Sequence, residues 1–187
     1  MLTSALLAGI IYSTSTQVVG LTQIYALVAI TYLYIALLAT PLTRLFVFLP
    51  FRGQYIKARR AIGVSAFFFS LLHAGFAFFG KLGGFAGLGF LDSKYLLAVG
   101  FSFLALVILS LLSLTSFDYM VSKLTFPRWK FLHRFVYLAG ILIVMHALLL
   151  GSHFTDLSGI IPRVFFAAFI VLFGLEAIRI YNYFKKR

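Results

Sequence analysis

The chain has 187 residues, of which 63% are hydrophobic and 11% are charged. About a quarter of the residues are charged in a typical soluble domain, so this composition excludes that class and favours a membrane protein. The net charge is +12, but the basic residues form short clusters between apolar runs, which is typical of membrane topology rather than of nucleic-acid binding. The chain has no cysteine, which excludes disulfides, thiolate zinc sites and iron–sulfur clusters and leaves histidine as the metal ligand.

Five apolar segments are long enough to cross a bilayer, which takes about 20 residues of α-helix. The opening "LLAGII" run that precedes them is too short to span, and we expect a half-helix or an interfacial segment there. No Pro- or Ser-rich linker and no internal repeat divides the chain. We therefore predict one all-α domain over residues 1–187, a polytopic integral membrane helical bundle whose five full spans cover residues 20–42, 60–79, 95–115, 131–150 and 160–181.

The connections between these spans alternate in charge. Lys and Arg are frequent in "TRLFVFLPFRGQYIKARR", in "DYMVSKLTFPRWK" and in the C-terminal "KKR", whereas "KLGGFAGLGFLDSK" and "GSHFTDLSGIIP" are nearly neutral. Cytoplasmic loops of membrane proteins carry the excess of positive charge. We therefore expect the basic segments, including the C-terminus, to lie in the cytoplasm. The glycine-rich "KLGGFAGLG" is expected to be a flexible turn on the outer side.

Histidine inside a membrane span is costly, and it therefore points to a functional site. His73 lies about fourteen residues beyond the inner boundary of the second span, and His146 lies about sixteen residues beyond that of the fourth. Both are thus expected past the midplane, at similar depth on parallel helices, as two axial ligands of one haem iron would be. His133 lies about 19 Å nearer the inner face. His153 falls in an outer loop, where a solvated histidine is ordinary, and is left out of the site.

The residues alone leave two points open. Each histidine would also be accounted for by a hydrogen bond to a neighbouring carbonyl or hydroxyl, because an unsatisfied polar group is costly in lipid. His133 and His146 are thirteen residues apart, which separates them by roughly 140° around an ideal helix. Either the helix is distorted, for which Gly140 is a candidate, or the two imidazoles serve sites that face different directions.

Two segments carry a family pattern. They are "KARRAIGVSAFFFSLLHAGFAFF", which contains His73, and "RWKFLHRFVYLAGILIVMHALLL", which contains His133 and His146. With "ATPLTR" and "SKYLLAVGFSFLALVILSLLSLTS" in matching order, the chain from about residue 20 onward resembles the ferric-reductase-like transmembrane family. Within that family it is most similar to the MsrQ (YedZ) branch, the haem subunits of the periplasmic methionine sulfoxide reductase system. The resemblance implies that His73, His146 and, less directly, His133 bind haem b.

One haem is expected from this resemblance, and a second is left open, because the second span has a single histidine where the wider family has two. The resemblance is also compatible with FMN as a further cofactor. The resemblance implies a redox subunit of the bacterial inner membrane rather than a complete enzyme. Its donor would be a quinone or a cytoplasmic flavin reductase, and its acceptor would be a periplasmic molybdenum-containing reductase. The expected partners are thus proteins and membrane lipid, with no nucleic acid.

Two other functions remain open. One is a stand-alone ferric or oxygen reductase component, and the other is a histidine-based proton or metal transporter. The spans contain almost no carboxylates, which disfavours the transporter because proton-coupled carriers commonly use them. Glu176 and Arg179, three residues apart near the inner end of the last span, are expected to form an ion pair.

Overall fold

The computed structural model describes residues 17–150 and 159–185, so the expected N-terminal segment and His153 lie outside the described residues. Every regular element in the described part of the chain is helical, which confirms the all-α prediction. In chain order the elements are α2 (Gln17–Leu45), α3 (Arg52–Gly75), the π-helical turn η1 (Phe76–Lys81), α4 (Phe85–Leu88), α5 (Ser93–Leu114), α6 (Asp118–Leu124), α7 (Phe126–Leu132), α8 (Phe135–Leu150) and α9 (Ile160–Lys185).

Five helical stretches in the described residues are long and apolar enough to cross a membrane. A span needs about 20 residues, and each of these stretches has at least 22. The chain is therefore a multi-pass helical membrane protein, as its composition predicts. The stretches are Gly20–Leu45, Arg52–Lys81, Ser93–Leu114, Phe126–Leu150 and Ile160–Lys185.

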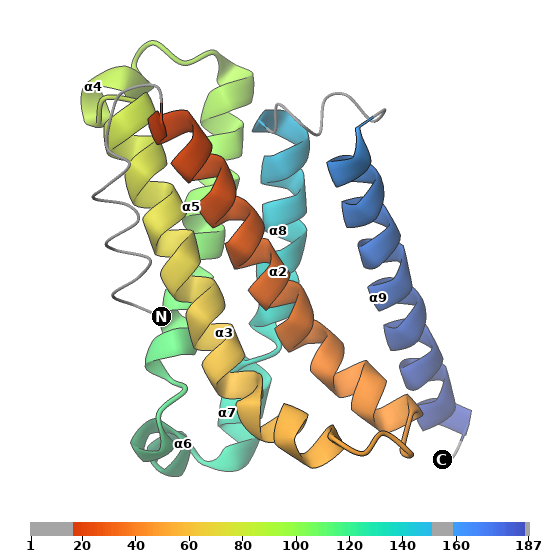
Figure 1. Ribbon diagram of the computed structural model, residues 1–187. Helices are drawn as coiled ribbons and strands as arrows, with labels where there is room; N and C mark the ends of the chain where they lie inside the picture. The colour runs from red at the N-terminus through yellow and green to blue at the C-terminus, as the bar shows by residue number, and fades with distance from the viewer. Residues whose placement is uncertain (1–16, 151–158, 186–187) are drawn as a thin grey trace.

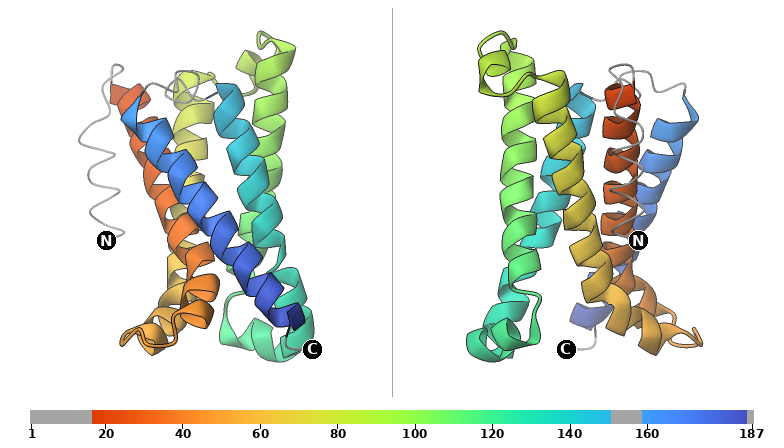
Figure 2. Two further views of the ribbon diagram at one scale, coloured as in Figure 1. Left: turned by 90° about the vertical axis from the view of Figure 1, so that its right-hand side faces the viewer. Right: turned by 60° about the vertical axis from the view of Figure 1, so that its left-hand side comes forward.

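The spans form a bundle in which α2 packs along α3, and α5 packs along α8 (Figure 1). α2 also contacts α8 and α9, while α3 contacts α5. Figure 2 shows α9 running beside α2, with α5 and α8 together on the other side of the bundle. Small residues at the centre let the helices approach closely. Ala66 of α3 and Ala139 of α8 have no exposed surface and pack in one cluster with Leu33 and Leu37 of α2.

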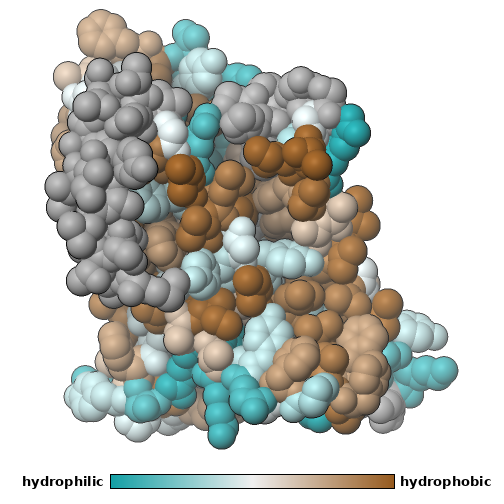
Figure 3. All heavy atoms as spheres, viewed as in Figure 1, coloured by the Kyte–Doolittle hydropathy of each residue, from teal (hydrophilic) through white to brown (hydrophobic). Residues whose placement is uncertain are grey.

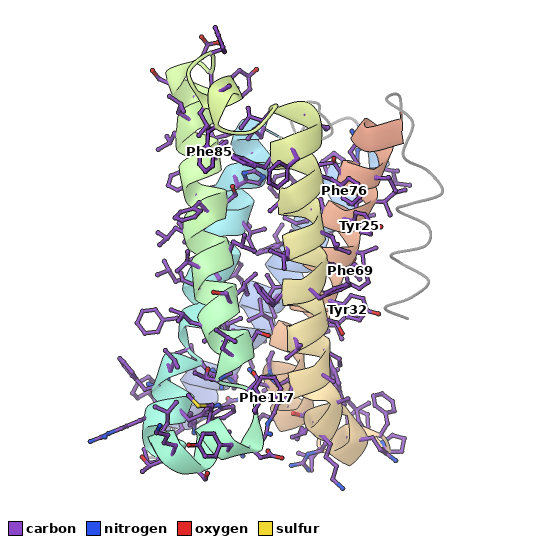
Figure 4. All side chains as sticks on the ribbon, turned by 90° about the vertical axis from the view of Figure 1, so that its left-hand side faces the viewer. Tyr25, Tyr32, Phe69, Phe76, Phe85 and Phe117 are labelled. Atoms are coloured by element: carbon purple, nitrogen blue, oxygen red, sulfur yellow. The ribbon has the colours of Figure 1, made fainter. Side chains whose placement is uncertain are left out.

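Aromatic side chains line the seam between α2 and α3 (Figure 4). Tyr25 stacks on Phe76 with ring centroids 5.5 Å apart, and Tyr32 stacks on Phe69 at 5.6 Å. The ring planes in these pairs differ by 22° and 12°, which is the offset-stacked arrangement that aromatic pairs favour. The stack fixes α3 against α2 on both sides of the turn of α3 that carries His73.

The second span begins earlier than predicted, at Arg52 rather than at residue 60. Residues that the charge pattern assigned to a loop continue the helix because they find partners on α2. The Tyr55 hydroxyl donates to the Ile35 carbonyl at 2.5 Å, and Arg59 Nε donates to the Ala36 carbonyl at 3.2 Å. Long basic side chains can lie along a helix while their charged ends find polar partners, so the charges do not end the span.

The fourth span is interrupted, but at His133–Arg134 and not at Gly140. α7 ends at Leu132 and α8 starts at Phe135, while α8 runs without a break through Gly140. Gly140 is buried close to Leu37, so its role is close helix packing rather than bending. Because of the break, the angle of roughly 140° that an ideal helix gives between His133 and His146 does not apply.

The glycine-rich segment between α3 and α5, which was predicted to be a turn, forms a turn closed by a backbone hydrogen bond. Gly83 and Gly84 have φ of 69° and 76°, which glycine adopts without strain. The Gly84 N–H donates to the Phe78 carbonyl at 2.8 Å, and the rings of Phe78 and Phe85 meet with centroids 5.0 Å apart.

The basic clusters gather at one end of the bundle. This end contains the α2–α3 connection, α6, α7 and the C-terminal end of α9 (Figure 1). In Figure 3 hydrophilic side chains lie at the lower and the upper end of the face, with a mainly hydrophobic middle between them. The alternation of charge along the sequence therefore corresponds to a separation of charge along the bundle axis, as a membrane protein requires.

Candidate histidine site

His73 lies near the C-terminal end of α3, and its ring contacts α2. Its Nδ1 donates to the Thr22 carbonyl at 2.9 Å. A carbonyl oxygen accepts only, so this bond requires the Nδ1–H tautomer of neutral His73. The Nε2 atom then keeps its lone pair, which is the form in which imidazole binds a metal.

His146 of α8 is held in the same way from another helix. Its Nδ1 donates to the Ala98 carbonyl of α5 at 2.9 Å, so its Nε2 also keeps a lone pair. α8 is otherwise almost wholly apolar: in "FVYLAGILIVMHALLL" only Tyr137 and His146 carry polar side-chain groups. A histidine in such a helix needs a partner, and the α5 carbonyl provides one.

The structure brings His73 and His146 together, with ring centroids 6.2 Å apart and ring planes at 79°. An imidazole nitrogen binds a metal at about 2 Å, so two imidazoles on opposite sides of one metal have ring centres about 6 Å apart. The observed spacing fits that arrangement.

The ligand set also favours a particular kind of metal. No group of three or more His, Cys, Asp or Glu side chains that could hold a bare ion is found among the described residues. A bare zinc ion takes three or four protein ligands, whereas a haem iron already has four nitrogen ligands from its macrocycle and needs only the axial pair. The two histidines therefore fit a haem better than a free ion.

His133 lies apart from this pair, at the junction between α7 and α8. Its Nε2 is 3.3 Å from Thr115 Oγ1, and its ring lies 4.2 Å from that of Trp129. The Thr115 hydroxyl already donates to the Leu111 carbonyl at 2.7 Å, so it accepts from His133. His133 is therefore protonated on Nε2, which is the opposite tautomer to that of His73 and His146.

Trp129 connects His133 to the charged end of the bundle. Its Nε1 donates to the Thr115 carbonyl at 2.9 Å, and the Arg60 guanidinium lies 5.8 Å from its ring centroid. Arg60 also forms an ion pair with Asp118, which is exposed. Trp129 and His133 are four residues apart, a spacing that places both on one face of a helix.

The expected pair of Glu176 and Arg179 is present, with Oε2 and Nε 2.5 Å apart. The structure adds a third member, because the Tyr137 hydroxyl of α8 donates to Glu176 Oε1 at 2.5 Å. Glu176 is buried, with 8% of its surface exposed. Nothing in the sequence predicts that Tyr137 and Glu176 meet, since they are 39 residues apart on different helices.

Comparisons with known proteins find two curated relatives. Both are curated as the haem-binding subunit MsrQ of protein-methionine-sulfoxide reductase. The one from Herminiimonas arsenicoxydans is 34% identical over 62% of this chain and 51% of its own length. The one from Agrobacterium fabrum is 32% identical over 81% of this chain and 66% of its own length. The chain thus spans about half to two thirds of the length of the curated relatives it matches.

A family model covers most of the helical bundle. The model for the ferric reductase like transmembrane component matches residues 19–144, which include α2 to most of α8. His73 and His133 lie inside this region, while His146 lies just beyond it and α9 follows. The chain therefore belongs to the ferric reductase like transmembrane component family and is similar to MsrQ proteins.

Proposed function

We propose that this chain is a haem-binding electron-transfer subunit of a bacterial inner membrane and serves a methionine sulfoxide reductase. The observation that carries the proposal is the meeting of His73 and His146, with each Nδ1 bonded to a carbonyl and the ring centroids 6.2 Å apart. The curated names of the relatives support haem as the cofactor. The whole chain, residues 1–187, then acts as one haem-binding domain.

His73 and His146 are the axial ligands in this proposal, through their Nε2 atoms. The carbonyls of Thr22 and Ala98 fix the tautomer and orientation of each ring and raise its basicity as a ligand. Apolar helices surround the pair, and both imidazoles are half-buried among them. A bound b-type haem supplies one-electron chemistry that no side chain of the chain offers.

His133 is a secondary residue in this proposal. Its Nε2 proton is engaged by Thr115, so only Nδ1 keeps a lone pair with which it would bind a second iron. Near the basic end of the bundle it is better placed to meet an incoming donor. We propose a quinone or a cytoplasmic flavin reductase as that donor, with FMN as an additional cofactor that the basic residues at this end would suit.

The direction of electron flow follows from the charge distribution. In this proposal the basic end, with the C-terminus, lies in the cytoplasm. The histidine pair lies toward the opposite face, because His73 and His146 are near the C-terminal ends of α3 and α8. Electrons therefore leave on the outer side, to a periplasmic molybdenum-containing reductase. A stand-alone ferric or oxygen reductase component is the second candidate, since the family match supports it equally.

Two measurements on the detergent-purified protein test the proposal. The first is the pyridine haemochrome content per chain, for which we expect about one b-type haem released without covalent cleavage. The second is reoxidation of the dithionite-reduced protein by a periplasmic methionine sulfoxide reductase with its substrate, compared with ferric citrate and oxygen. A colourless preparation from haem-replete cells contradicts the haem proposal. Rapid reoxidation by ferric citrate or oxygen alone favours the second candidate.

A further inference from the structure

The last span contains a buried carboxylate that haem binding does not use. Glu176 is the only glutamate of the chain. It accepts a hydrogen bond from Tyr137 of α8 and pairs with Arg179, one turn further along α9. A carboxylate at this position is costly unless it is paired, and an apolar residue would pack at less cost. We therefore expect Glu176 to serve through the directed hydrogen bond that it accepts, which an apolar residue could not form.

α8 is the helix that such a bond would constrain. Tyr137 and His146 are its only residues with polar side-chain groups, and each bonds to a different neighbouring helix. They are nine residues apart, which at 100° and 1.5 Å per residue places them on opposite faces of α8 and about 13.5 Å apart along it. The two bonds thus hold α8 from both sides and at two levels.

Apolar contacts alone specify the rotation of α8 weakly. A helix that is hydrophobic all round has no polar face to distinguish one orientation from another. α8 is also separated from α7 by the break at His133–Arg134, so the basic end of the span does not fix its rotation. Single buried polar contacts can select one register among several similar packings.

We propose that Glu176 is a positioning residue for the histidine site: by accepting from Tyr137 it fixes the rotation of α8 and thereby directs His146 Nε2 toward His73. This inference rests on the proposed function, because His146 matters as an axial ligand. It assigns a role to α9, which lies outside the region that the family model matches. Arg179 pairs with Oε2 of Glu176, while Oε1 accepts the bond from Tyr137.

The test compares substitutions that keep or remove the directed bond. Glu176→Gln retains a carbonyl oxygen that can accept from Tyr137, whereas Glu176→Leu and Tyr137→Phe remove the bond. Tyr181→Phe on α9 is the matched control, since Tyr181 is 66% exposed. The readouts are the electron paramagnetic resonance g values of the oxidised haem, which report axial-ligand orientation, and the rate of haem transfer to excess apomyoglobin.

We expect Glu176→Leu and Tyr137→Phe to shift the g values alike and to speed haem loss by about tenfold, as loss of a ligand-orienting contact does. Glu176→Gln and Tyr181→Phe should match the wild type. Unchanged g values in Glu176→Leu and Tyr137→Phe contradict the inference, even if both variants unfold more easily. It is also contradicted if Glu176→Gln behaves like Glu176→Leu while Tyr137→Phe is silent, since the charge alone would then matter. A wild-type protein without haem overturns the proposed function instead.

Discussion

Replacing either member of the histidine pair should remove most of the haem. In the proposed site, His73→Ala deletes an axial ligand and leaves the opposing Nε2 of His146 as the only imidazole on the iron. Loss of a contact that merely orients a ligand already weakens metal binding by about 10- to 100-fold. Loss of the ligand itself should therefore cost at least about 100-fold, or roughly 2.7 kcal/mol of binding free energy. His146→Ala should cost a similar amount, because the two rings hold equivalent bonds to carbonyls at 2.9 Å.

The assay is haem per chain after detergent purification, followed by haem transfer to apomyoglobin. His133→Ala is the control, since it removes an imidazole from the same span without touching the pair. We expect it to retain a low-spin haem, in lower amount or with a shifted potential if it serves a second site. The reasoning is refuted if His133→Ala loses all haem while His146→Ala keeps a normal low-spin spectrum. The axial pair would then lie toward the basic end of the bundle.

The remaining predictions concern His133, topology and the outer loop. Thr115→Val removes the acceptor of the His133 proton and should lower the free energy of unfolding by about 1 kcal/mol. The absorption spectrum of the haem should be unchanged. A lost or altered haem spectrum would show that His133 supports the axial pair. A C-terminal green fluorescent protein fusion should fluoresce and an alkaline phosphatase fusion at the same position should be inactive, and the reverse result would invert the orientation. His153→Ala should leave haem content and spectrum unchanged, and a loss of haem there would add an outer ligand to the site.

Apolar length was sufficient to predict the five spans, but it did not predict where the second and the fourth begin. Arg52–Arg59 looked like a loop because of its charge, yet Tyr55 and Arg59 donate to carbonyls of α2 and the helix continues. The break at His133–Arg134 was also missed, because the run on either side is uniformly suited to a helix. Such ends depend on contacts with other helices, which local sequence does not reveal.

Depth along the spans was enough to predict that His73 and His146 meet, because parallel helices with a common boundary keep residues at matched levels. The partners that hold the pair could not be predicted. Two of them are backbone carbonyls, which every residue has, and the tie between Tyr137 and Glu176 depends on how α9 lies against α8. The pairing of Glu176 with Arg179 was predictable because it lies within one helical turn.

Electron paramagnetic resonance of the oxidised, purified protein tests most directly whether His73 and His146 hold one haem iron between them. Two imidazole ligands give low-spin ferric iron, whereas an iron with one imidazole is mainly high-spin. We predict a low-spin signal that accounts for about one haem per chain and that disappears in His73→Ala and in His146→Ala. A mainly high-spin signal in the wild type, or a low-spin signal that survives both substitutions, would contradict the assignment of this pair.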